Sequence, residues 1–210
     1  MKKIKARTKI EAGIAVLLLF AIVVVSGTVT ITDVSVSVDG TTLDGNTFYG
    51  WNASNATMIR NSNGRYWEPT GENIQNAIND LVSGGVVYLP SGTIEVTTQI
   101  LMDDDIWLKG SGMTTVLHIT GNTLTSGNKD NVTFSDFKIT GNFGIYAWAS
   151  TGNHNGLWVE NVEATITNPS ISGAFVVIAN NDYTYSDITF IDCRAIDCGN
   201  FGWMFSGSVG

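Results

Sequence analysis

A short pattern repeats along the second half of the chain, and it constrains the fold more than any other feature. The pattern is apolar, x, apolar, x, Asp or Asn, apolar, x, apolar, where x is mostly polar. Repeats of this length are typical of solenoids, in which each unit packs only against its neighbours. Three full copies follow one degenerate copy at offsets of about 26, 25 and 31 residues: Ile106–Gly110, Val132–Ile139, Leu157–Ala164 and Ile188–Ala195.

The alternation within each copy predicts β-strands, and no amphipathic helical stripe separates one copy from the next. A sheet built from βαβ units is therefore excluded. One coil of such strands cannot cover its own apolar side chains, whereas coils stacked about 4.8 Å apart bury them and pair their backbone groups. The sequence therefore predicts an all-β fold, a parallel β-helix, from about Ser83 onwards.

One amphipathic helix is predicted just before the first coil. Thr70 can cap its N-terminus, and Gly84-Gly85 can end it. Its apolar positions follow helical spacing and form one narrow stripe, which suits a helix that covers the end of the solenoid. These positions are Ile74, Ala77, Ile78 and Leu81.

Residues 28–69 are predicted to form a small β-rich head. Apolar residues alternate with polar ones from Val34 to Val38, which is typical of a strand with one covered face. Met58–Arg60 and Arg65–Trp67 flank Asn63-Gly64, a pair that tolerates positive φ, so a hairpin is expected there. The chain thus divides into residues 1–27, a head of residues 28–69, and residues 70–210 with the capping helix and the coils.

The first 27 residues have the pattern of an export or anchor segment. Five basic residues up to Lys9 precede an apolar run, Ile14–Val25, which ends at Ser26-Gly27. This order is typical of a secretory signal peptide that is cleaved, which is the interpretation we favour. A retained membrane anchor is the alternative, since the apolar stretch extends towards the ~20 residues that a membrane helix needs. Either way, the rest of the chain is expected to be extracellular or at the cell surface.

Charge and cysteine content narrow the range of partners. Without the first 27 residues the chain keeps 6 basic and 18 acidic residues, a net charge of −12. Such a surface repels nucleic acid, so no nucleic-acid partner is expected. Two cysteines, Cys193 and Cys198, make no disulfide framework, and we expect them to be buried thiols.

Three segments resemble the entry of the pectate-lyase-like right-handed parallel β-helix superfamily: Gly71–Ile78, Gly84–Thr93 and Leu108–Gly112. In that family an amphipathic helix caps the N-terminal end of the solenoid and the coils follow. The resemblance covers Thr70 to Gly210 and implies right-handed coils. It implies no single activity, because lyases, hydrolases, epimerases, viral tailspikes and surface adhesins share this fold.

Stacked coils turn equivalent positions into columns, and two columns are predicted to be structural. The first places short polar side chains at a turn, where they bond neighbouring backbone groups and one another. The second alternates in charge, so neighbours attract by about 0.2 to 1 kcal/mol. The members are Asp136, Asn161 and Asp192 in the first column, and Lys138, Glu163 and Arg194 in the second.

Aromatic side chains are predicted to face outward on two of the sheets. Exposed aromatic rings in register form a flat apolar strip with polar edges, which suits stacking on sugar rings or on another protein. The alternative is that the loops 150–156 or 180–186 fold over this strip and bury it. The predicted carbohydrate-binding residues are Trp107 and Trp158 on one sheet, and Tyr146, Trp148 and Phe175 on the other.

No complete catalytic motif is visible. Glycoside hydrolysis needs two carboxyl groups across the sugar, and the outward aromatic rows contain none. Arg194 could act as a lyase-type base, but a surface ion pair is the simpler interpretation. Asp103–Asp105 could bind Ca²⁺ loosely, although such runs are usually solvated turns. The catalytic residues, if the chain is an enzyme, therefore stay unknown, and we predict no metal site and no cofactor other than this Ca²⁺ alternative.

The sequence favours a secreted or cell-surface protein that binds polysaccharide or glycan. The alternatives are the N-terminal part of a polysaccharide lyase or glycoside hydrolase, and a structural scaffold or adhesin. Phe201–Gly207 resembles Phe143–Trp148, so the chain is expected to end in mid-coil. Bare terminal coils expose apolar rows and strand edges. The sequence therefore predicts either a fragment or an end that a partner chain covers.

Overall fold

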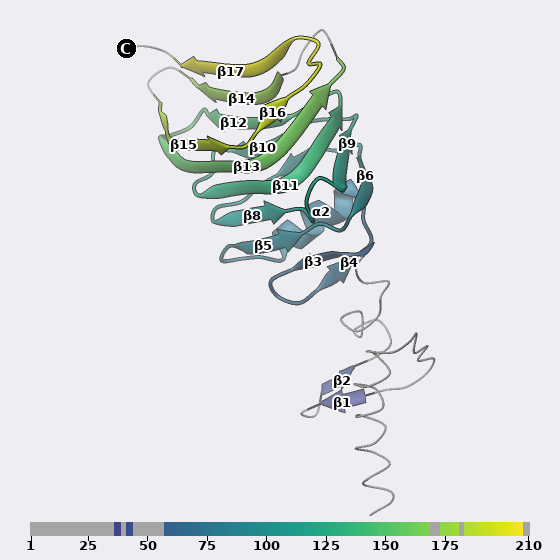
Figure 1. Ribbon diagram of the computed structural model, residues 1–210. Coiled ribbons are helices and arrows are strands. Elements are labelled where there is room, and N and C mark those ends of the chain that lie inside the picture. The colour runs from purple at the N-terminus through teal and green to yellow at the C-terminus, as the bar shows by residue number, and fades with distance from the viewer. Residues whose placement is uncertain (1–35, 39–40, 44–56, 169–172, 181–182, 208–210) are drawn as a thin grey trace, which may run out of the picture. The chain divides into compact units, whose positions relative to one another are not determined.

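The computed structural model describes residues 36–38, 41–43, 57–168, 173–180 and 183–207 (Figure 1). The chain forms two compact units, residues 1–56 and 57–210. In the first unit, strands β1 (Val36–Val38) and β2 (Thr41–Leu43) pair antiparallel. The predicted signal or anchor segment lies outside the described residues. Within the described ranges, no helix is long and apolar enough to cross a membrane.

The second unit is an all-β parallel solenoid of about five turns. Its strands form three stacks, which we call faces 1, 2 and 3, and Figure 1 shows them as successive rungs. Face 1 contains β5 (Gly85–Tyr88), β8 (Ile106–Lys109), the first parts of β11 (Val132–Gly141) and β13 (His154–Ile166), and β15 (Tyr185–Ile191). Face 2 contains β6 (Gly92–Val96), β9 (Thr115–Ile119), the second parts of β11 and β13, and β16 (Arg194–Ala195). Face 3 contains β7 (Ile100–Leu101), β10 (Leu124–Gly127), β12 (Ile145–Ala149), β14 (Gly173–Ala179) and β17 (Phe201–Gly207).

Each coil contributes to all three faces, and we number the coils 1 to 5 from β5 to β15. The predicted stacking is confirmed by the strand register. Phe134 of coil 3 lies opposite Val159 of coil 4, which lies opposite Phe190 of coil 5. Leu108 of coil 2 precedes Phe134 in the same column. Because Leu108, Phe134 and Val159 are fully buried, this column is part of one continuous core.

Helix α2 (Gly71–Asn79) precedes coil 1 and begins where Thr70 accepts the backbone N–H of Asn73 at 3.2 Å. Its buried side chains Ile74, Ala77 and Ile78 belong to the same core. The helix ends at Asp80, four residues before Gly84. The apolar stripe predicted from the sequence is therefore the side of α2 that meets the core.

The hairpin expected around Asn63-Gly64 is present, with a φ of 79° at Gly64. It consists of β3 (Ile59–Asn61) and β4 (Tyr66–Trp67), which pair antiparallel. β3 also pairs antiparallel with β5, so the hairpin extends face 1 at the edge of coil 1. In face 1, β3 and β5 therefore pair antiparallel, whereas the strands of successive coils pair parallel.

The predicted polar column marks the corner between faces 1 and 2. Asp136, Asn161 and Asp192 all have left-handed φ values, between 50° and 63°. Asn and Asp tolerate this conformation better than most residues, because their short side chains bond locally. The Nδ2 of Asn161 donates to Oδ1 of Asp136 at 2.9 Å. The column is therefore structural, as predicted.

A second left-handed column, which the sequence pattern did not predict, lies one position before the first inward residue of each face 1 segment; in β13 and β15 this position is inside the strand. Asn131 Nδ2 donates to Asp105 Oδ1 at 3.0 Å, as Asn161 does to Asp136 at the other corner. At Gly156 an added Cβ would lie 2.5 Å from Asn131 Oδ1, so only glycine fits there. The members are Gly84, Asp105, Asn131, Gly156 and Asp187.

Candidate aromatic binding surface

The outward side chains of face 1 fall into two adjacent columns. The first contains Val86, Trp107, Thr133, Trp158 and Thr189, one from each coil. The second contains Arg60 of the hairpin, then Tyr88, Lys109, Ser135, Glu160 and Ile191. We use the name face 1 strip for the five residues Tyr88, Trp107, Lys109, Trp158 and Glu160. The strip joins two indole rings to a cation and a carboxylate.

Trp107 is half-buried and held in place on the strip. Its Nε1 donates to Oγ of Ser135 at 2.9 Å. Lys109 Nζ lies 4.5 Å from the centroid of the Trp107 ring, within the range of a cation–π contact. The indole therefore has a fixed orientation.

Trp158 is the most exposed ring of the strip, with 41% of its surface accessible. Its Nε1 donates to Oε2 of Glu160 at 3.1 Å, and this bond fixes the indole. Thr133 separates Trp158 from Trp107 in the column, so the two rings are two strand spacings apart, roughly 9.6 Å. The column follows the solenoid axis, and a ligand that spans both rings must be extended.

The positive charges of the solenoid are distributed unevenly. Of the six Lys and Arg side chains at the described positions, four form ion pairs of 3.3 Å or less. The other two, Arg60 and Lys109, lie over the rings of Tyr88 and Trp107, at 4.4 and 4.5 Å from the centroids. Lys109 also lies 4.0 Å from Asp136. Face 1 therefore carries the two cations that are least neutralised by acidic partners.

On face 3 the outward column is less aromatic than predicted. Tyr146 lies opposite Val176, is half-buried, and accepts the backbone N–H of Gly173 on its hydroxyl at 3.3 Å. Burial raises the pKa of Tyr146 above its ordinary value. Trp148 lies opposite Ile178 and has 47% of its surface exposed. Trp148 is thus an isolated exposed ring.

The prediction that Phe175 points outward is wrong. Phe175 lies opposite Ile145, an inward residue, and is fully buried. Its ring stacks on Trp203 of the next coil at a centroid distance of 4.4 Å and meets Phe190 edge-on at 5.6 Å. Gly173–Ala179 is apolar at almost every position, so the alternation of apolar and polar residues could not show which of its side chains point inward. Phe175 belongs to the core and to no binding surface.

The acidic run Asp103–Asp105 contacts the next coil. Lys129 pairs with Asp103 and, at 3.6 Å, with Asp104. The Lys129 ammonium lowers the pKa of Asp103, and the Asp103 carboxylate raises the pKa of Lys129. Asp104 also accepts the backbone N–H of Asp130 at 2.8 Å. Across the residues that the structure describes, no group of three or more His, Cys, Asp or Glu could hold a metal ion.

His154 pairs with Asp130 at the corner between faces 3 and 1, a pair that the sequence pattern did not predict. Its Nδ1 lies 3.1 Å from Oδ1 of Asp130, which also accepts the backbone N–H of Asn155 at 3.0 Å. Nearby, the Tyr185 hydroxyl donates to the carbonyl of Lys129 at 3.0 Å. Among the described residues, His154 Nε2 is buried and has no partner. This nitrogen is enclosed and therefore not available to an external substrate, and the pair joins successive coils.

Searches of protein-family models, curated proteins and solved structures find no match to this chain. The fold is therefore assigned from the strand register, and the resemblance to the pectate-lyase-like superfamily rests on the sequence segments alone.

Proposed function

We propose that the solenoid binds polysaccharide or glycan through the face 1 strip. The observation that carries this proposal is the single outward column in which Trp107 and Trp158 flank Thr133. Sugar rings present C–H groups on their faces and hydroxyls at their edges. Indole rings can pack against the faces, while Lys109 and Glu160 can hydrogen-bond the hydroxyls.

The fixed orientation of both indoles supports this proposal. Each ring is bonded to a neighbouring side chain before any ligand arrives, Trp107 to Ser135 and Trp158 to Glu160. A surface that is ordered in advance loses less conformational entropy when it binds. The strand spacing favours an extended oligosaccharide that lies along the solenoid axis.

We also propose the fold family of the solenoid and its location outside the cytoplasm. We infer a right-handed β-helix of the pectate-lyase-like kind, with α2 as its N-terminal cap. The basic and apolar N-terminal segment exports or anchors the chain, so that the solenoid is displayed outside the cytoplasm. Polysaccharides are abundant in that location.

The test is a binding titration by calorimetry against neutral and uronate-containing polysaccharides, with and without Ca²⁺. Trp158→Ala should weaken binding by tenfold or more, since a packed Trp at an interface often contributes about 2 kcal/mol. The matched control is Trp148→Ala, which removes a Trp of similar exposure from face 3. It should leave the affinity unchanged.

Three results would overturn the proposal. The first is no binding to any polymer of the panel, which would favour a structural scaffold. The second is an equal loss of affinity in both Trp variants. The third is turnover: unsaturated products would indicate a lyase, and new reducing ends alone would indicate a hydrolase.

A further inference from the structure

Face 1 separates opposite charges along the solenoid axis. Its second outward column begins with two cations, Arg60 and Lys109, on either side of Tyr88. It continues with Ser135 on coil 3 and the carboxylate of Glu160 on coil 4. Glu160 is thus two strand spacings from Lys109 and four from Arg60, roughly 9.6 and 19 Å along the axis. The positive end of this column is at the hairpin, and its negative end is at coil 4.

The two ends of the column remain separate because the side chain between them has other partners. Ser135 is fully buried, and its Oγ accepts a hydrogen bond from Nε1 of Trp107 at 2.9 Å and donates one to Oδ2 of Asp136 at 3.0 Å. Lys109 Nζ lies 4.0 Å from Oδ2 of Asp136, which is a long contact for an ion pair. Within the described ranges, Glu160 forms no ion pair. The Lys109 ammonium and the Glu160 carboxylate are therefore available to a ligand.

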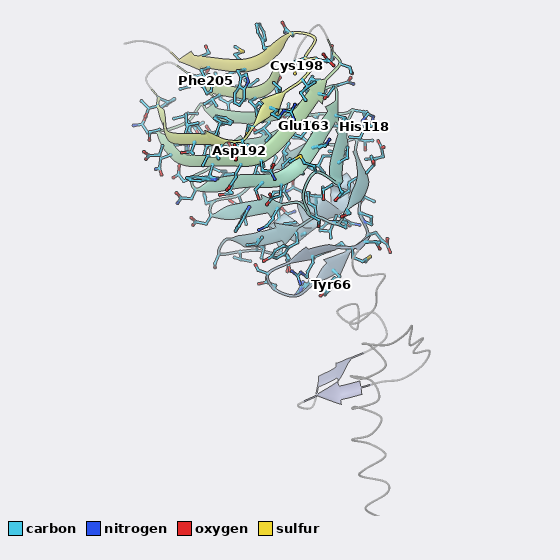
Figure 2. All side chains as sticks on the ribbon, in the orientation of Figure 1. Tyr66, His118, Glu163, Asp192, Cys198 and Phe205 are labelled. Atoms are coloured by element: carbon cyan, nitrogen blue, oxygen red, sulfur yellow. The ribbon has the colours of Figure 1, made fainter. Side chains whose placement is uncertain are left out.

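The other two faces differ from face 1 in their charges. On face 2, Glu163 pairs with Lys138 at 3.0 Å and with Arg194 at 3.3 Å, so the cations of this face are already neutralised. Figure 2 shows Glu163 together with His118 on this side of the solenoid. On face 3, none of the described strands contains a charged residue. Among the described strands, face 1 is thus the one that presents an unneutralised cation and an unneutralised carboxylate beside exposed rings.

The net charge of the chain disfavours a ligand that carries charges of one sign. Residues 28–210 contain 6 basic and 18 acidic side chains, a net charge of −12, so the chain as a whole repels a polyanion. A polycation instead meets Arg60 and Lys109 on face 1 itself. A ligand whose positive and negative groups cancel avoids both repulsions. Its anions can still pair with Lys109, and its cations with Glu160.

Given the proposed glycan-binding function, we propose that the ligand is a glycan without net charge that carries both carboxylate and amino groups. The sugar that packs on Trp158 bears an ammonium group, which pairs with Glu160 and lies against the indole ring. A carboxylate nearer the hairpin pairs with Lys109 or Arg60. Such a glycan alternates acidic and amino sugars, and the two charges of face 1 select it over a neutral polymer.

The probes are hyaluronan, which alternates a uronate with an N-acetylated amino sugar, and the same polymer after N-deacetylation, which carries a carboxylate and an ammonium group in each repeat. Dextran is the neutral polymer, and chitosan carries amino groups alone. Affinities are measured by calorimetry with the 210-residue chain, at a pH at which the amino groups are protonated. N-deacetylated hyaluronan should bind about twofold to fivefold more tightly than each of the other three polymers, and added salt should reduce this preference.

Glu160→Gln removes the negative charge but keeps an oxygen that can accept Nε1 of Trp158. It should lower the affinity for N-deacetylated hyaluronan by about twofold to fivefold without weakening the binding of hyaluronan. Lys109→Gln should weaken the binding of both polymers, since both carry carboxylates. Glu72→Gln is the matched control, because Glu72 is an exposed acid on α2 and its substitution changes the net charge by the same amount. It should leave the preference unchanged.

Equal affinities for hyaluronan and its N-deacetylated form would overturn this proposal, and so would a preference that survives Glu160→Gln. If Trp158→Ala still weakened binding in either case, the glycan-binding function would stand without it. No binding to any of the four polymers would overturn both. An alternating Lys-Glu polypeptide that bound as tightly as N-deacetylated hyaluronan would also overturn this proposal, since face 1 would then recognise charges without a sugar. Circular dichroism confirms that each variant is folded before its result is interpreted.

Discussion

The two edges of the solenoid differ in what covers the same kind of core. At coil 1, helix α2 and the β3–β4 hairpin bury Ile59, Ile74 and Ile78 almost completely. At coil 5, Trp203 and Phe205 are inward by register and still 40% and 60% exposed. Both edges have apolar side chains, so burial there depends on a covering element and not on the coil sequence.

The covered edge also has polar contacts of its own. Asn61 of the hairpin is buried, and its Nδ2 donates to Oδ2 of Asp80 at 2.9 Å and to the carbonyl of Ala77 at 3.2 Å. Its Oδ1 accepts the backbone N–H groups of Asn63 and Arg65. One side chain thus links the hairpin turn to the end of α2. A covering element needs such links as well as an apolar side.

The largest effect is expected for Ile78→Ala, which removes a buried side chain where α2 meets the core. Truncation of a buried Ile leaves a cavity and should lower the free energy of unfolding by about 2 to 5 kcal/mol. Denaturant unfolding followed by circular dichroism measures this change. Val82→Ala, at a position 94% exposed just beyond α2, is the control and should be nearly neutral. If Ile78→Ala lowered the free energy of unfolding as little as Val82→Ala, α2 would not stabilise this edge.

A smaller loss is expected for Asn61→Ala. The substitution removes the acceptor of the N–H groups of Asn63 and Arg65 and the donor to the carbonyl of Ala77, at a cost of about 1 to 3 kcal/mol. Amide hydrogen exchange should show faster exchange at Asn63 and Arg65. Unchanged exchange there would contradict the role of Asn61 as the link between hairpin and helix.

Acid should weaken the same link. Hydrogen bonds from Asn61 and Asn63 and the charge of Arg65 outweigh burial and lower the pKa of Asp80. A lowered folded pKa means that the contribution of Asp80 to stability is complete above the ordinary Asp pKa of about 3.9 and is lost as pH falls through the folded value. The stability difference between the native chain and Asp80→Asn should therefore shrink as pH falls from about 7 to about 3. A constant difference would contradict this prediction.

The smallest effect is expected at the open edge. Phe205→Ala removes a ring that is 60% exposed, so the free energy of unfolding should fall by less than about 1 kcal/mol. Thermal unfolding provides the comparison with Ile78→Ala. A loss as large as that of Ile78→Ala would mean that Phe205 is covered in solution.

The stacking of coils 3 to 5 could be predicted because two signals agree there. The alternation of apolar residues sets which side chains point inward, and the Asp or Asn at the corner fixes the register between copies. Asp136 and Asn161 mark the same corner, so Phe134 and Val159 had to be neighbours. Around Phe175 the apolar residues do not alternate with polar ones, and the predicted outward direction of this side chain is wrong.

The binding surface could be predicted only in part. Trp107 and Trp158 lie inside the repeated pattern, so their outward direction follows from the register. His154 and Asp130 lie 24 residues apart, outside the pattern that defined the repeat, so the sequence did not predict their contact. The left-handed column that contains Asp105 and Asn131 did have a signal, a Gly, Asp or Asn directly before the first inward residue of each face 1 segment. That signal lies outside the pattern that defined the repeat.

The alternating column has a consequence for how such a chain can lengthen or shorten. Lys138 and Arg194 carry the same charge 56 positions apart, as do Asp136 and Asp192, with Asn161 and Glu163 between them. Excision of coil 4 by itself would set Arg194 against Lys138 and Asp192 against Asp136, two repulsive contacts in one step. Duplication or loss of neighbouring coils in pairs avoids this conflict, so the natural unit of growth for this stretch is two coils.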